Sequence, residues 1–173
     1  MAQKATAETD GSGSNHPAAD LETIVVDVDD IIECERRNAR DRDEQRTHVL
    51  RVSPPFEGER TASLHVSEDY SYYPPEMDPK PIHLAPHQFH DAEFGYPESW
   101  EVHAAAKEVD GVEDLADVSE ETLEECWDVQ LEVWEGNVRS SLKDELELTD
   151  LGWHGTGNVE SPTVPVEFVE DEA

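Results

Sequence analysis

Basic residues are scarce in this sequence of 173 residues, which has 12 Lys or Arg against 43 Asp or Glu and a formal net charge of −31. In dilute buffer a compact domain with this charge repels itself strongly. In molar salt the Debye length shrinks to about 3 Å, and most of that repulsion is screened. Lysine is rarer than arginine, four against eight. Acid excess with few lysines is typical of halophiles that accumulate salt, so we expect a halophilic protein.

Long hydrophobic runs and cysteines are also rare. The longest run among Ile, Val and Leu is Ile24–Val26, which excludes a membrane-spanning helix. Met1–Asn15 has no apolar stretch, so we expect no secretory signal. The two cysteines, Cys34 and Cys126, are expected to be reduced thiols because nothing indicates export. We therefore expect a location in a high-salt cytoplasm, away from membranes.

The acidic residues are spread evenly, which favours a folded domain over a disordered chain. High net charge with low hydrophobicity is typical of disorder, but this sequence also has four Trp, four Phe and four Tyr. Its length suits one domain with a core of its own. We expect a disordered acidic tail over residues 1–20, a single α+β domain over residues 21–169 and a frayed C-terminus over residues 170–173.

Apolar periodicity predicts two main helices in this domain. The first runs from about Asp30 to about Asp43, behind an acidic N-cap. The second begins after Ser119 and has one apolar face with residues three or four apart. That face consists of Leu123, Trp127, Leu131, Trp134, Val138 and Leu142.

Alternating residues predict the strands. Thr47–Ser53 and Arg60–Val66 form one predicted antiparallel hairpin, and Glu145–Thr149 and Val164–Val169 form another. A short strand is predicted at Ile82–Leu84. The expected fold is thus α+β, with two main helices packed against a small, mostly antiparallel sheet.

Three segments carry a resemblance to a known family. They are VLRVSPPFEGERTASLHV (Val49–Val66), PIHLAP (Pro81–Pro86) and a late helix with Trp134 and Arg139. Together they resemble a small haloarchaeal family of acidic domains with no assigned activity. The resemblance implies a saline habitat and a compact α+β fold, and it implies no catalytic residue.

A group of histidines is the sharpest candidate for chemistry. His83, His87 and His90 follow one another at spacings of four and three, and Asp91 comes next. Imidazoles with a carboxylate suit a transition metal such as zinc, nickel or iron. Pro86 opposes the helix that would align the three rings. The alternative is that these histidines decorate a loop and bond to the backbone.

A cluster of arginines is the second candidate. Half of all basic residues lie within 16 positions, namely Arg36, Arg37, Arg40, Arg42, Arg46 and Arg51. Such a face could pair with a partner's carboxylates, or with neighbouring acids of its own helix. We do not expect nucleic acid as a ligand, because phosphate binding weakens steeply with salt.

The leading hypothesis is a halophilic accessory or interaction protein without enzymatic activity or cofactor. Arg36, Arg37 and Arg40 would contact a protein partner or a second copy, together with Tyr72 and Tyr73 of the Pro-rich segment 69–97. Long ordered loops of this kind are often functional. One alternative is a metal-binding protein or metalloenzyme that uses the three histidines. Another is a structural component of a halophilic virus particle.

Overall fold

The chain adopts an α+β fold. The computed structural model describes residues 18–41, 47–67, 76, 80–148 and 162–170. These residues form three α-helices and one six-stranded mixed sheet. The chain divides into two compact units, residues 1–89 with 143–173 (the sheet unit) and residues 90–142 (the hairpin unit). The single domain over residues 21–169 stays a prediction.

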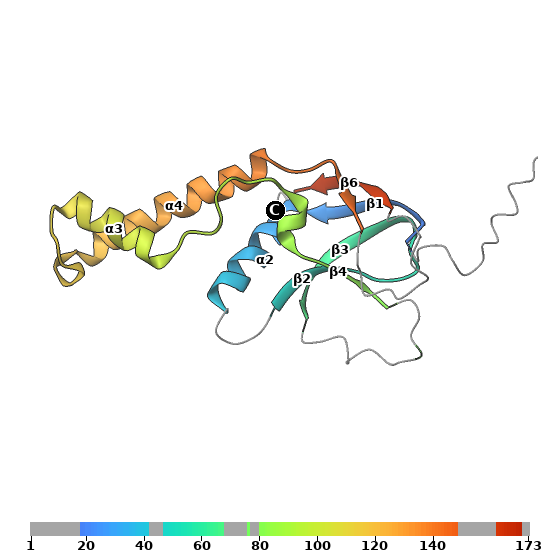
Figure 1. The fold of residues 1–173 in the computed structure, drawn as a ribbon, viewed down its shortest axis with the longest axis horizontal. Helices are drawn as coiled ribbons and strands as arrows, with labels where there is room; N and C mark the ends of the chain where they lie inside the picture. The colour runs from blue at the N-terminus through green and yellow to red at the C-terminus, as the bar shows by residue number, and fades with distance from the viewer. Residues whose placement is uncertain (1–17, 42–46, 68–75, 77–79, 149–161, 171–173) are drawn as a thin grey trace, which may run out of the picture. The chain divides into compact units, whose positions relative to one another are not determined.

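The sheet is mixed because its central strand is parallel to both neighbours. The strands are β1 (Asp20–Asp27), β2 (Thr47–Val52), β3 (Glu57–Ser67), β4 (Ile82–Leu84), β5 (Glu145–Glu147) and β6 (Thr163–Val169). They are ordered β4-β2-β3-β1-β6-β5 (Figure 1). Strand β1 is parallel to β3 and β6, whereas the other three pairs are antiparallel.

The prediction of a mostly antiparallel sheet was therefore wrong. Alternation identified both hairpins, β2–β3 and β5–β6, and each is antiparallel as expected. It did not reveal that β1 separates them, with one strand of each hairpin on either side. A strand pattern shows which face is buried, but it does not show which strands are neighbours.

Helix α2 (Val28–Arg40) follows β1 directly and packs against β1, β2 and β3. The Asp27 carboxylate caps it by accepting a hydrogen bond of 2.8 Å from the backbone N–H of Asp29. The helix therefore begins before the predicted start, and it ends earlier than predicted. The residues that it buries are Val28, Ile31, Ile32 and Cys34.

A side-chain clamp joins Asn38 of α2 to His48 of β2. The buried ring of His48 shows which face of β2 meets α2, because its Nδ1 lies 3.3 Å from Oδ1 of Asn38. The side chain of Asn38 donates to the carbonyl of His48 at 3.0 Å and accepts from its N–H at 2.6 Å. Leu50 and Val52 share this face and are fully buried. Because side chains alternate along a strand, Arg51 lies on the opposite face of the sheet.

The hairpin unit consists of α3 (Ser99–Asp110), a short 3₁₀ helix η4 (Leu115–Asp117) and α4 (Glu120–Ser140). Helices α3 and α4 pack against each other (Figure 1). Ser119 caps α4 as predicted, since its hydroxyl accepts from the N–H of Thr122 at 3.1 Å.

Asp110 connects the end of α3 to the start of α4. Its carboxylate accepts from the N–H of Ser119 at 2.9 Å and from the hydroxyl of Thr122 at 2.8 Å. These hydrogen bonds lower the pKa of Asp110. Helix α3 was absent from the two-helix prediction. It buries only Val102 and Ala106, so its sequence has no long apolar face.

The structure also bears on the thiols and on membrane insertion. Cys34 and Cys126 are both free. Among the described residues, no helix combines the length and the apolar character that are needed to cross a bilayer.

Candidate functional site

The predicted arginines of α2 meet carboxylates of their own chain. Nε of Arg37 lies 2.8 Å from Glu33, and Nη1 of Arg36 lies 3.6 Å from the same carboxylate. Nε of Arg40 lies 3.7 Å from Asp41. These contacts match the alternative of pairing within the chain. A partner-binding role for these arginines stays a prediction.

The predicted aromatic contacts cannot be located on the fold. Tyr72 and Tyr73 lie outside the described residues. From that Pro-rich segment the structure describes residue 76 and residues 80–97, including β4 and a 3₁₀ helix, η3 (Pro86–Phe89).

The three predicted metal ligands have separate environments. Nδ1 of His83 on β4 lies 3.1 Å from the hydroxyl of Ser67, and His87 on η3 is exposed. His90 is buried, and its Nδ1 accepts from the N–H of Ala92 at 3.1 Å. Within the described part of the chain, no three His, Cys, Asp or Glu side chains are placed to hold a metal ion. Metal binding stays a prediction without a ligand set.

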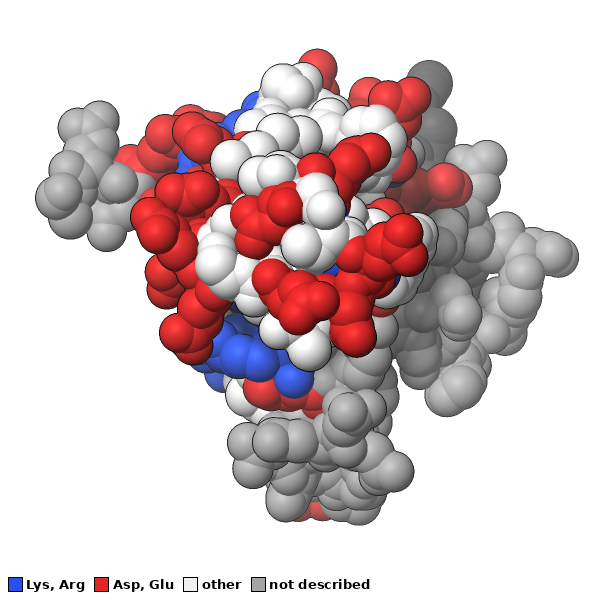
Figure 2. All heavy atoms as spheres, turned by 90° about the vertical axis from the view of Figure 1, so that its left-hand side faces the viewer, with Lys and Arg blue, Asp and Glu red and all other residues white. Residues whose placement is uncertain are grey.

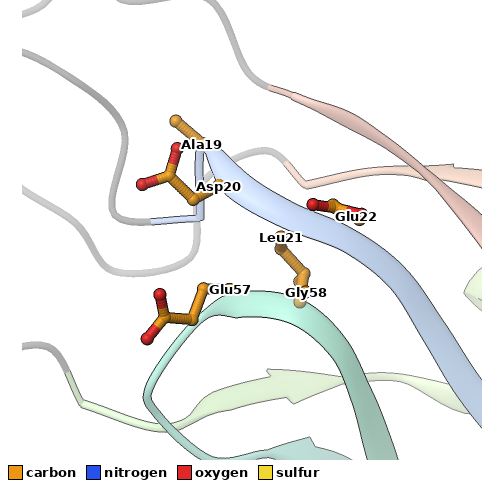
Figure 3. A pocket seen from close by; sticks show the side chains of 6 residues that line it. All are labelled: Ala19, Asp20, Leu21, Glu22, Glu57 and Gly58. Atoms are coloured by element: carbon orange, nitrogen blue, oxygen red, sulfur yellow. The ribbon is translucent and has the colours of Figure 1, made fainter.

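An acidic hollow of about 510 Å³ lies where β1 and β3 begin. Its lining is Ala19, Asp20, Leu21, Glu22, Glu57 and Gly58. Figure 3 shows the carboxylates of Asp20 and Glu57 on the same side of the hollow, with Glu22 apart from them. All three side chains are exposed, so water solvates them. Ca²⁺ takes about six to eight oxygen ligands. Three exposed carboxylates, one of them apart from the other two, do not make such a ligand set, so we do not propose a cation site here.

The hairpin unit presents exposed apolar side chains on a highly acidic background. Among the described residues, seven large hydrophobic side chains are exposed, and six of them belong to this unit. They are Phe94, Trp100, Val109, Leu115, Val129 and Val133. Residues 90–142 contain sixteen Asp or Glu and two Lys or Arg, a net charge of −14. Figure 2 shows acidic residues dispersed over one face of the molecule, with few Lys or Arg.

Some of these side chains surround a cavity of about 380 Å³. Its lining is Phe94, Gly95, Pro97, Glu101, Gln130, Val133 and Trp134. Trp134 is 2% exposed, and Tyr96 packs edge-on against it with ring centroids 5.0 Å apart. Phe94 and Val133 are 60% and 58% exposed. Val129 lies one helical turn before Val133. We call Phe94, Val129 and Val133 the hairpin patch.

One carboxylate is held in place at this cavity. Glu101 accepts a hydrogen bond of 3.0 Å from the N–H of Glu98, as part of the capping box that begins α3. Glu101 is the single ionisable side chain in the described lining. The cavity therefore suits an apolar group that carries a cation beside it.

A known family model covers most of the chain. The chain belongs to the DUF8009 family. The family model, described as a domain of unknown function, matches residues 11–161 and so includes the whole hairpin unit. The expected likeness to a family without assigned activity is confirmed, because the matching family is a domain of unknown function. No curated protein and no solved structure matches the chain.

The sequence contains a weak signal for the hairpin patch. Val129 and Val133 are four residues apart, which places them on one side of a helix. They lie outside the apolar face that was predicted from Leu123 to Leu142. Phe94 comes from a separate segment before α3, so periodicity along one helix could not join it to the two valines.

Proposed function

We propose that this protein is a non-enzymatic accessory protein of a halophile, and that its hairpin patch binds a basic, amphipathic segment of a partner protein. The exposure of Phe94 and Val133 beside a cavity is the observation that carries this proposal. Soluble monomers seldom expose a contiguous apolar patch without a function for it. A buried aromatic or aliphatic anchor is the usual centre of a protein interface.

The charge of the hairpin unit supports a basic partner. A net charge of −14 over residues 90–142 opposes a second copy of the same surface. It opposes nucleic acid and anionic membranes for the same reason. Lys or Arg residues that flank an apolar anchor would pair with Glu101 and with neighbouring acids.

The composition and the sequence resemblance support a halophilic, haloarchaeal setting. At molar salt, attraction between charges acts over only about 3 Å. Ion pairs must then form in direct contact, and burial of apolar surface must supply much of the affinity. The hairpin patch combines both features, since Glu101 lies in the same cavity as Phe94 and Val133.

A binding assay with a synthetic peptide tests the proposal. The probe is an 18-residue Lys/Leu peptide that forms an amphipathic helix, labelled for fluorescence anisotropy in 1 M KCl. We expect saturable binding that Val133→Glu weakens about tenfold, which corresponds to about 1.4 kcal/mol. Val109→Glu is the matched control, because Val109 is 68% exposed and does not line the cavity.

Two results of this assay would overturn the proposal. One is equal binding of a Glu/Leu peptide of the same pattern, because the charge of the partner would then be irrelevant. The other is equal weakening by the two valine substitutions.

In cells, a photoreactive residue in place of Val133 should cross-link a segment with net positive charge. A cross-linked segment with net negative charge would contradict the assignment.

A further inference from the structure

A polar cluster lies on the face of the sheet opposite α2. Arg51 on β2 is directly across from His83 on β4, and its other cross-strand neighbour is Ser63 on β3. His65 on β3 is across from Val49, two residues from Arg51, so it is a diagonal neighbour on the same face. Three adjacent strands therefore bring an arginine and two histidines together.

Direct contacts link these side chains. Nη1 of Arg51 lies 3.4 Å from Nε2 of His65. The rings of His65 and His83 have centroids 5.6 Å apart, and Nδ1 of His83 lies 3.1 Å from the hydroxyl of Ser67. We call Arg51, His65, Ser67 and His83 the sheet-face cluster. All four side chains are partly exposed, so a small solute can reach them.

Arg51 differs from the arginines that pair with carboxylates. Arg36, Arg37, Arg40 and Arg139 each lie within 4.0 Å of a carboxylate oxygen. The contact of Arg51 is a histidine ring. Its Nε is buried without a hydrogen-bond acceptor among the described residues, which is also true of the Nε of Arg36. A buried donor of a charged group without an acceptor is costly. Among the described residues no ion pair joins Arg51 to a carboxylate, so its positive charge is available to an anionic ligand.

We propose that the sheet-face cluster binds an oxyanion, a carboxylate or phosphate group, with Arg51 as the positive charge and His65, His83 and Ser67 as hydrogen-bond donors. A planar guanidinium matches both anions geometrically. A metal cation suits the cluster less well, because Arg51 would repel it and only two imidazoles are present.

The protonation of the histidines supports this assignment. Burial, followed by the charge of Arg51, lowers the pKa of His65. Burial, His65 and Arg51 together lower the pKa of His83 to about 4. Arg51, His65 and His83 are the titratable groups that face one another from β2, β3 and β4. A bound anion would stabilise the protonated rings, so binding takes up protons and tightens as the pH falls from 7 to 5.

A titration followed by NMR tests the proposal on the full chain. Imidazole resonances are recorded while inorganic phosphate or acetate is added, at constant ionic strength set with KCl. We expect saturable shifts of His65 and His83 with at least one anion, whereas the exposed His87 stays unchanged. The phosphate and acetate arms identify which oxyanion is preferred. Arg51→Gln should weaken binding about tenfold, and Arg40→Gln, on α2, should leave it unaltered.

The design separates binding from loss of fold. Arg51→Lys keeps the positive charge and loses the planar fork, so it should bind with intermediate affinity. This variant tests the proposal even if Arg51→Gln does not fold. Absence of a saturable shift in the wild-type protein at pH 5.5 with either anion would overturn the proposal. Equal shifts of His65, His83 and His87 would also overturn it, because they would indicate general screening.

Discussion

The low pKa of His83 predicts that stability falls as the pH falls from 7 to 5. The folded protein holds this ring neutral to about pH 4, because burial, His65 and Arg51 all disfavour its charged form. In the unfolded chain the ring takes up a proton near pH 6.5. Between these two values the unfolded state binds more protons, so the free energy of unfolding decreases with decreasing pH. Above pH 7 the contribution is complete, and below about pH 4 this group causes no further loss.

The size of the effect follows from the two pKa values. A difference of one pKa unit corresponds to about 1.36 kcal/mol. Integration from pH 7 to pH 5 gives a ceiling of about 1.9 kcal/mol for a single histidine. His83 is partly exposed, so solvent screening reduces this figure, and we expect a loss of about 1 kcal/mol.

The assay compares urea unfolding of the wild type and His83→Gln at pH 7 and pH 5, in molar KCl, by circular dichroism. The wild type should lose about 1 kcal/mol more than the variant over this interval. His87→Gln is the control, because the imidazole of His87 on η3 is exposed, and this variant should behave as the wild type. An identical pH dependence in His83→Gln and the wild type would refute the reasoning. A directly measured His83 pKa near 6.5 would refute it as well.

Three further predictions concern the side-chain clamp between Asn38 and His48, the two thiols, and the dependence of stability on salt. Asn38→Ala should cost about 1–3 kcal/mol in urea unfolding, because the N–H and carbonyl of His48 lose their hydrogen bonds to Asn38; a loss under 0.5 kcal/mol would contradict this. A disulfide reagent at pH 8 should label Cys126 in the native protein. Cys34 is buried with its pKa raised to about 12 by burial and then by Glu35, so it should react only after unfolding. Circular dichroism should show a more stable fold in molar KCl than in dilute buffer, and equal stability would exclude the halophilic interpretation.

Local patterns predicted most of the elements but not their arrangement. The short strand at Ile82–Leu84 and the helix after Ser119 are confirmed, as are both hairpins. These elements have strong local signals, namely alternation, capping and a continuous apolar face. The parallel pairing of β1 depends on contacts between distant segments, and periodicity has no information about them. Helix α3 was not predicted, because it buries only two side chains and so has no long apolar face.

The candidate sites were harder to predict, because each joins side chains from separate elements. The arginines of α2 were conspicuous in sequence, yet the structure places Glu33 and Asp41 beside them. Arg51 was part of the same cluster in sequence, and strand alternation separates it from the α2 face. His83 was expected beside His87 and His90, whereas its ring lies beside the ring of His65 from another strand. Register across β3, β2 and β4 decides this neighbour, and the sequence of one strand does not specify it.

The two proposed sites have opposite charge, and the high-salt setting that we propose would impose the same requirement on both. When charges act over about 3 Å, a charge that is surrounded by water contributes little to recognition. The charges that remain effective are those held at a fixed position beside the group that a ligand would contact. Glu101 is held by its capping bond at the cavity of the hairpin unit, and Arg51 is held beside His65 in the sheet unit. Among 55 charged side chains, such fixed groups can discriminate between ligands, while the dispersed acids mainly keep the protein hydrated. Substitution of Glu101 or Arg51 should therefore alter binding more than the removal of several acids that lie away from the two sites.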